Sequence, residues 1–204
     1  MRLNYWPYSF PLLEAECPCD VHFVQYLAER KIRGKAIFHF GTGEHHLVGF
    51  NNARRRPHNR NEVLAVTASP EEHAAYVERV IRNAELAKQY KVLFADIYTF
   101  TPRLLPRFDL VTLFHLCEFF DPVRSGYAPL DDAGLLELFL GKLNAGGRLF
   151  FYRGSMSFDQ ARPIIEDFVR RGRLWWREDF KTLAVYGAEP PSGTQEEDVL
   201  RGPA

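Results

Sequence analysis

The stretch AIFHFGTGEHH, residues 36–46, contains the sharpest local signal in the sequence. Its first five residues form a largely apolar run, which is typical of a parallel strand buried on both faces. Gly41-Thr42-Gly43 comes directly after it. Glycine suits this place because the backbone turns tightly and a ligand approaches without a Cβ in the way. The stretch predicts a strand followed by either a ligand-binding loop or a plain strand-to-helix turn.

Further short apolar runs alternate with helical patterns along the chain. The predicted strands are residues 63–66, 91–95, 110–114, 148–152, 174–176 and 183–186. The last two have no helix between them, and their spacing favours an antiparallel hairpin. The alternation elsewhere predicts right-handed crossovers and a parallel sheet. Ligands of such sheets bind at the carboxyl ends of the strands.

Three helices between these strands carry start or stop signals. Residues 69–72, SPEE, have the pattern of a capping box with proline at the first helical position. The apolar stripe expected to face the core is Ala74, Val77, Ile81 and Ala84. Asp131 and Asp132 open a second helix, which residues 144–147, NAGG, are expected to end. A third helix near residues 160–171 is expected to stop at Gly172.

Composition excludes several classes of partner and location. Lysine plus arginine equals aspartate plus glutamate at 26 each, so net charge predicts neither nucleic acid nor an anionic membrane as a partner. No apolar run approaches the ~18 residues of a membrane span, and no signal-peptide pattern is visible. Three cysteines are too few for a disulfide framework. We therefore expect a cytoplasmic protein.

The strand-end elements resemble those of a known superfamily in order and spacing. After Gly41 and Gly43 come Asp96, then Asp109 with Glu118 downstream, and finally the closing hairpin. This order resembles the class I S-adenosylmethionine-dependent methyltransferases over about residues 30–187. The resemblance implies an α/β three-layer sandwich with a Rossmann-like, seven-stranded, mostly parallel sheet. It also implies the strand order 3-2-1-4-5-7-6, with strand 7 antiparallel.

The resemblance implies S-adenosylmethionine as cofactor and assigns roles to individual residues. Gly41 and Gly43 match the loop that packs against the methionine part of the cofactor. Asp96 matches the acidic residue that binds the adenine amino group, and Phe114 and His115 match positions near the methyl donor. The predicted cofactor-binding residues are His39, Gly41, Thr42, Gly43, Thr67, Ala68, Asp96, Ile97 and Phe114.

Three positions depart from the family pattern. His39 stands where the family usually has an acidic residue, and His45 replaces the third glycine of the loop. Thr67 stands where a carboxylate usually holds both ribose hydroxyls. Losing one charge-assisted pair costs roughly 1.5–3 kcal/mol, about tenfold to a hundredfold in affinity. Ser69 and Glu71 are the candidates to compensate.

His115 is the predicted catalytic residue. A neutral imidazole can accept a proton from a hydroxyl or amine as that atom attacks a methyl group. A purely structural histidine at a strand end explains the residue equally well. For Glu118 we expect a structural role, as a helix cap or a hydrogen-bond partner.

No metal site is predicted from the ligand-type residues. The histidines at positions 39, 45, 46 and 115 match no ligand spacing that we can defend. Cys17-Pro18-Cys19 with His22 lacks the separations and the second ligand pair of common zinc sites. We therefore expect the thiols to be incidental to a loop.

The chain divides into three predicted parts: residues 1–30 as an N-terminal aromatic arm and helix, 31–188 as the methyltransferase-like domain, and 189–204 as a flexible tail. The aromatic residues of the arm are Tyr5, Trp6, Tyr8 and Phe10. The arm is expected to cover the active site, to pack on the core, or to pack on a second copy in a homodimer.

The leading functional hypothesis is methyl transfer from S-adenosylmethionine to a small-molecule acceptor, because no insertion resembles a domain for recognising macromolecules. The alternative is a non-catalytic or repurposed member that binds another metabolite or a protein partner. The departures at His39, His45 and Thr67 motivate it. A nicotinamide-dependent dehydrogenase is disfavoured because position 46 is histidine where its fingerprint needs glycine.

Overall fold

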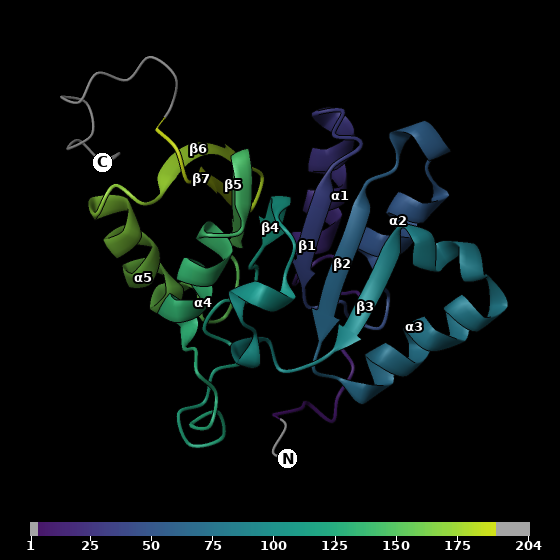
Figure 1. The fold of residues 1–204 in the computed structure, drawn as a ribbon, viewed down its shortest axis with the longest axis horizontal. Helices are drawn as coiled ribbons and strands as arrows, with labels where there is room; N and C mark the ends of the chain where they lie inside the picture. The colour runs from purple at the N-terminus through teal and green to yellow at the C-terminus, as the bar shows by residue number, and fades with distance from the viewer. Residues whose placement is uncertain (1–3, 191–204) are drawn as a thin grey trace.

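The computed structural model describes residues 4–190, and its centre is one seven-stranded sheet (Figure 1). The strands are β1 (Ala36–Phe40), β2 (Glu62–Thr67), β3 (Tyr90–Phe94), β4 (Phe108–Thr112), β5 (Leu143–Tyr152), β6 (Trp175–Phe180) and β7 (Leu183–Gly187). Their order is β3-β2-β1-β4-β5-β7-β6. The first five strands pair in parallel, and β7 runs antiparallel to β5 and β6. The expected strand order and the antiparallel hairpin are confirmed.

Helices cover both faces of the sheet. The α-helices are α1 (Cys19–Glu29), α2 (Leu47–Arg54), α3 (Pro70–Arg82), α4 (Asp132–Leu140) and α5 (Phe158–Arg170). Short 3-10 helices cover Pro57–Asn59, Ala84–Lys88, Ile97–Thr99 and Pro102–Leu104. One core cluster contains residues of α1, α2 and α3, and a second contains residues of α4 and α5. The result is the expected three-layer sandwich, with β1 and β4 at its middle.

Strand β1 has apolar residues at successive positions because both of its faces are buried. Ile37 packs into the cluster with α1, whereas Phe38 packs into the cluster with α4, and both side chains are fully buried. Successive side chains of a strand point to opposite faces, so a central strand needs apolar residues at every position. His39 lies on the same face as Ile37, facing α1, where Asp20 is its neighbour.

Helix α3 begins as expected but buries a different face. The Ser69 hydroxyl accepts a hydrogen bond from the Glu72 N–H, which is the predicted cap. The predicted inward stripe is wrong, however, because Ile81 is 78% exposed and Val77 38% exposed. Glu72 and Tyr76 are buried instead. Their polar atoms hydrogen-bond to groups on other elements, and these contacts set the rotation of the helix.

Several boundaries also differ from the sequence prediction, among them β6, which is Trp175–Phe180 rather than 174–176. Strand β4 is Phe108–Thr112, two residues earlier than expected. Helix α4 ends at Leu140, and residues 144–147 belong to β5 rather than to a helix end. The pairing of β4 with β5 shifts register there. Gly146 has φ +69°, so its glycine serves an irregularity within the strand.

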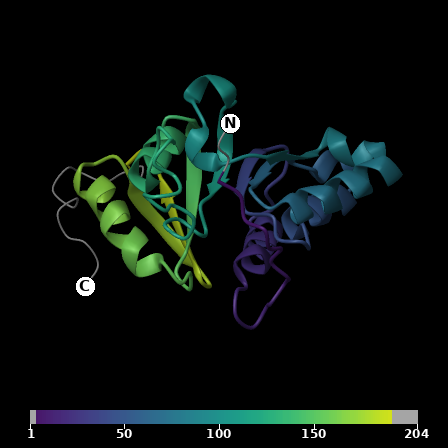
Figure 2. The same cartoon turned by 90° about the horizontal axis from the view of Figure 1, so that it is seen from below.

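The N-terminal arm, residues 4–18, runs along the middle of the molecule between its two halves (Figure 2). It leads into α1, which ends within the expected first part of the chain. Most of the tail predicted for residues 189–204 lies outside the described residues. Among residues 4–190, no helix is long and apolar enough to cross a membrane.

Candidate functional site

A cavity of about 210 Å³ lies at the carboxyl ends of β1 to β4, under the N-terminal arm. Parallel strands present their ligand sites at this edge of the sheet. The lining residues from the strand ends include Gly41, Gly43, Thr67, Ala68, Asp96, Ile97 and His115. Those from the arm include Asn4, Trp6, Phe10 and Cys17. Trp6 and Phe10 pack edge-on against Phe119, so aromatic rings form much of the wall.

The glycine loop after β1 has the backbone that only glycine adopts easily. Gly41 has φ +83° and Gly43 has φ +55°. A Cβ on Gly43 would lie 2.9 Å from the Phe10 carbonyl oxygen, and this oxygen accepts a hydrogen bond from the Glu44 N–H at 3.0 Å. Gly43 is therefore required by the backbone turn and by the close approach of the arm. A Cβ on Gly41 would meet nothing within 4 Å, which leaves space beside it.

Glu72 is a buried carboxylate at this loop, and the sequence prediction missed its role. Its Oε2 accepts hydrogen bonds from the hydroxyls of Thr67 (2.6 Å) and Thr42 (2.9 Å). Its Oε1 accepts one from the Phe10 N–H at 3.2 Å. Glu71, the acidic candidate named from the sequence, is exposed. Because Glu72 was expected to fold back as part of a capping box, its direction could be found only from the tertiary structure.

Asp96 follows β3 and is also buried in the cavity wall. Its Oδ1 accepts a hydrogen bond from the Tyr98 N–H, and its Oδ2 accepts one from the Tyr127 hydroxyl at 2.6 Å. The Tyr127 oxygen in turn accepts from the Asn4 N–H at 2.7 Å. The arm is thus tied to both cavity carboxylates, through Phe10 to Glu72 and through Tyr127 to Asp96.

A second polar group lies behind the glycine loop. His39 is buried, and its Nδ1 is 2.8 Å from the Thr112 hydroxyl. Its Nε2 has no hydrogen-bond partner among the described residues and lies 3.6 Å from Asp20 Oδ1. Burial opposes ionisation of Asp20, but the imidazoles of His39 and His45 outweigh it and lower the pKa of that carboxyl. Asp20 therefore carries negative charge at the cavity wall.

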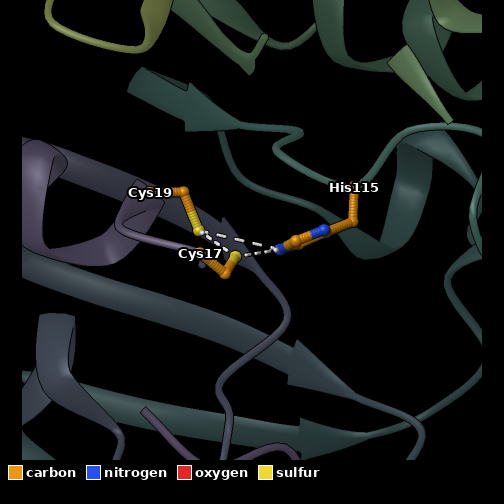
Figure 3. A group of neighbouring side chains, drawn as sticks. All are labelled: Cys17, Cys19 and His115. Atoms are coloured by element: carbon orange, nitrogen blue, oxygen red, sulfur yellow. Dashed lines mark hydrogen bonds between the residues drawn. The ribbon is translucent and has the colours of Figure 1, made fainter. Parts of the chain in front are cut away.

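Cys17, Cys19 and His115 all line the cavity, and their side chains point toward one another (Figure 3). The two sulfur atoms are 3.5 Å apart, and His115 Nε2 lies 3.9 Å from Cys17 Sγ and 3.7 Å from Cys19 Sγ. His115 Nδ1 is 2.9 Å from Glu118 Oε1, which also accepts from the Ser155 hydroxyl. Glu118 thus orients the ring, in keeping with the structural role expected for it.

The pKa values of Cys17, Cys19 and His115 are shifted in different directions. The hydrogen bond from Cys19, helped by His115, lowers the pKa of Cys17 to about 5. That same bond and burial raise the pKa of Cys19. Burial opposes protonation of His115, yet its bonds to Cys17 and Glu118 prevail and raise its pKa to about 10. Near neutral pH the cluster holds a Cys17 thiolate beside a His115 imidazolium.

The cavity brings most of the sequence-predicted site residues together. The predicted cofactor-binding residues that line it are Gly41, Gly43, Thr67, Ala68, Asp96 and Ile97, and His115 lines it too. His39, Thr42 and Phe114 are buried behind the wall instead. Thr42 still acts on the site through its bond to Glu72. No sequence signal pointed to Glu72 or Asp20, and none linked the two cysteines to His115.

Comparisons with known proteins give a match in fold only. No protein-family model and no curated protein matches the sequence. The CcbJ methyltransferase from Streptomyces caelestis superposes with a TM-score of 0.60 at 11% identity, covering 88% of this chain and 93% of that one. Precorrin 8w decarboxylase from Methanobacterium thermoautotrophicum superposes at 0.55 and 13% identity, covering 91% and 97%.

A longer enzyme also matches in part. Coclaurine N-methyltransferase, bound to N-methylheliamine and S-adenosylhomocysteine, is 19% identical, with a TM-score of 0.48 over 74% of this chain. The chain spans only 40% of that enzyme's length. The first two structures superpose on most of this chain at a TM-score above 0.5, so they share its fold. The chain therefore has the fold of the class I S-adenosylmethionine-dependent methyltransferases.

Proposed function

We propose that the chain binds S-adenosylmethionine in the cavity and catalyses methyl transfer to a small-molecule acceptor. The observation that carries this proposal is the buried carboxylate of Glu72 beside the glycine loop. It supplies negative charge where Thr67 leaves the β2 end without the usual acidic residue. Glu72 thereby compensates for the departure that weighs most against cofactor binding.

The hydrogen-bonding capacity of the two carboxylates fits this role. An ionised carboxylate offers about four acceptor sites. Glu72 uses three of them within the protein, so one remains on Oε1 for a ribose hydroxyl. Asp96 uses two, which leaves room for the adenine amino group. Gly41, with open space beside it, would accommodate the methionine part.

The cofactor supplies an electrophilic methyl group on a sulfonium centre, and the chain has to position and deprotonate the acceptor. His115 is the residue predicted for proton transfer. Glu118 orients the ring through Nδ1 at 2.9 Å, which leaves Nε2 beside Cys17. The pKa of His115 is raised to about 10, so proton transfer to this ring should increase as the pH rises above neutrality.

The arm that covers the cavity favours a small acceptor over a macromolecule. The arm crosses the glycine loop and hydrogen-bonds through the Trp6 N–H to the Ala68 carbonyl at 3.0 Å. An acceptor inside is therefore enclosed by Trp6, Phe10 and Phe119. A cytoplasmic location belongs to the same proposal, since a reducing compartment keeps the three cysteines as free thiols.

Calorimetric titration with S-adenosylmethionine and S-adenosylhomocysteine tests the proposal. We expect saturable binding, weakened about 10–100-fold by Asp96→Ala because one charge-assisted hydrogen bond is lost. Glu71→Ala removes an exposed carboxylate one residue from Glu72 and serves as the control with unchanged affinity. Absence of both heat and thermal shift at about 1 mM ligand would overturn the proposal.

One observation favours the alternative, a repurposed member that binds a different metabolite. Both cavity carboxylates already accept hydrogen bonds from the protein, and the arm supplies one of these directly. A ligand that needs fewer acceptors than a nucleoside would leave those bonds intact. Binding of S-adenosylhomocysteine that is unaffected by Asp96→Ala and by Glu72→Gln would favour this alternative.

A further inference from the structure

Cys17, Cys19 and His115 present three soft or borderline ligand atoms to one point. The thiols come from the arm and the start of α1, whereas the imidazole follows β4, 98 residues from Cys17. The three ligand atoms therefore come together only in the folded chain. We propose that these three side chains bind a single Zn²⁺ ion and leave its fourth coordination position open to the cavity.

The spacing of the ligand atoms matches tetrahedral zinc. Zn–S bonds of about 2.3 Å and a Zn–N bond of about 2.0 Å place two sulfurs about 3.8 Å apart and each sulfur about 3.6 Å from the nitrogen. The observed separations are 3.5 Å between the sulfurs and 3.7 and 3.9 Å to Nε2. An ion just outside their plane would reach all three atoms without a change of backbone.

The groups that surround the three ligands are also those of a metal site. A zinc-bound histidine usually donates its other ring N–H to a carboxylate, which fixes the tautomer and the ring orientation. Glu118 accepts from His115 Nδ1 at 2.9 Å, so Nε2 faces the thiols. The Ser155 hydroxyl donates to the same Glu118 oxygen and holds the carboxylate. An incidental loop thiol would not need this support.

The ligand set points to zinc and to an exchangeable fourth ligand. Two thiolates and one imidazole favour Zn²⁺ over the harder Mg²⁺ and Ca²⁺. The thiols bind as thiolates and the imidazole as the neutral ring, so their protons pass to solvent. All three residues line the cavity. Three protein ligands with one open position are the arrangement of catalytic zinc sites, where water or substrate takes the fourth place.

Cobalt titration of reduced, chelator-treated protein tests the site. We expect one Co²⁺ per chain, an intense near-ultraviolet thiolate-to-cobalt charge-transfer band, and loss of the band when one equivalent of Zn²⁺ is added. Cys17→Ser and Cys19→Ser should each remove about half of the band, since each leaves one of the two thiolates. Cys117→Ser is the matched control, because this third thiol lies outside the cluster and should leave the band unchanged.

Glu118→Gln adds a test that does not remove a ligand. It should weaken Zn²⁺ binding by roughly 10–100-fold, as measured by competition with a chromophoric chelator. Circular dichroism of each metal-free variant checks that the fold is retained. No charge-transfer band in wild type, or a band that survives in the Cys17→Ser/Cys19→Ser double variant, would overturn the proposal. So would isolation of a reducible Cys17–Cys19 disulfide as the native state.

The metal proposal does not depend on methyl transfer. Titrations with S-adenosylhomocysteine in the presence and absence of Zn²⁺ separate the two. Zinc binding without nucleoside binding leaves the site intact and removes the proposed function. Nucleoside binding without any metal binding has the opposite consequence.

Discussion

Two walls of the cavity differ in how the chain assembles them. The carboxylate wall consists of Thr67, Glu72 and Asp96, with Thr42 buried behind it. Thr67 and Asp96 stand at or just after neighbouring strands, whereas Glu72 lies in the first turn of α3. The thiol wall consists of Cys17, Cys19, His115 and Glu118, and it joins the arm to the end of β4. The first wall is fixed by the strand ends and by the rotation of α3, and the second by the path of the N-terminal arm.

The hydrogen bonds of the two walls differ as well. The carboxylate wall has short bonds from hydroxyl and backbone donors to a buried anion, such as 2.6 Å from Thr67 to Glu72. The thiol wall has contacts of 3.5–3.9 Å between sulfur and its partners. Removing a buried carboxylate that accepts short bonds from three donors should cost more than removing a half-exposed thiol with longer contacts. We infer that the carboxylate wall contributes more to stability than the thiol wall does in metal-free protein.

Glu72→Ala should show the largest effect. It leaves the buried Thr42 and Thr67 hydroxyls without their acceptor and removes the part-buried bond from the Phe10 N–H, so we expect a loss of about 3 kcal/mol in the free energy of unfolding. Urea denaturation measures the loss. Glu71→Ala, exposed in the same turn, is the control and should stay within about 1 kcal/mol of wild type. Equal effects of the two variants would show that the buried hydrogen bonds of Glu72 do not stabilise the fold.

Low pH should reduce the free energy of unfolding through protonation of His46, which lies next to the carboxylate wall. This buried ring bonds to the Tyr90 hydroxyl and to the Glu72 carbonyl, and burial lowers its pKa to about 4. The unfolded chain takes up the proton near pH 6.5, the folded chain only near pH 4. Stability is therefore complete above pH 6.5 and falls as the pH drops toward 4, by up to about 3 kcal/mol.

His46→Gln tests this linkage because it keeps a donor and an acceptor but cannot titrate. Urea denaturation between pH 7 and pH 4 should give a smaller decline for the variant than for wild type. His58→Gln changes an exposed histidine and should decline as wild type does. An identical decline in all three proteins would contradict the assignment.

Features that depend on strand register and local signals could be predicted from the sequence. The β1 run, the glycine loop, the Ser69 cap and the final hairpin are readable because each depends on neighbouring residues. The direction of Glu72 is not readable, because a capping-box glutamate and a buried acceptor have the same local sequence. The prediction of the buried face of α3 is wrong for a related reason: the polar contacts of Glu72 and Tyr76 set the rotation of the helix and leave the apolar stripe exposed.

The thiol wall could not be predicted from the local sequence for a different reason. The two thiols of Cys17-Pro18-Cys19 are evident in the sequence as a possible ligand pair. The third ligand, His115, follows β4, and only the tertiary structure shows that the arm brings the thiols beside it. Ligand spacings in sequence describe sites built within one loop or motif. A site that joins an arm to a strand end has no such spacing.

Cys17→Ser should have the smallest effect on stability. The side chain is only half-buried, and its contacts to Cys19 and His115 are long bonds involving sulfur. We expect the free energy of unfolding of metal-free protein to fall by about 1–2 kcal/mol at pH 7 in urea, because the variant loses the pair of the half-exposed Cys17 thiolate with the His115 imidazolium. With Zn²⁺ present the wild type should gain stability by mass action and the variant much less, because a ligand that binds only the folded state stabilises it. A loss without metal as large as that of Glu72→Ala would make the thiol wall a structural clasp instead.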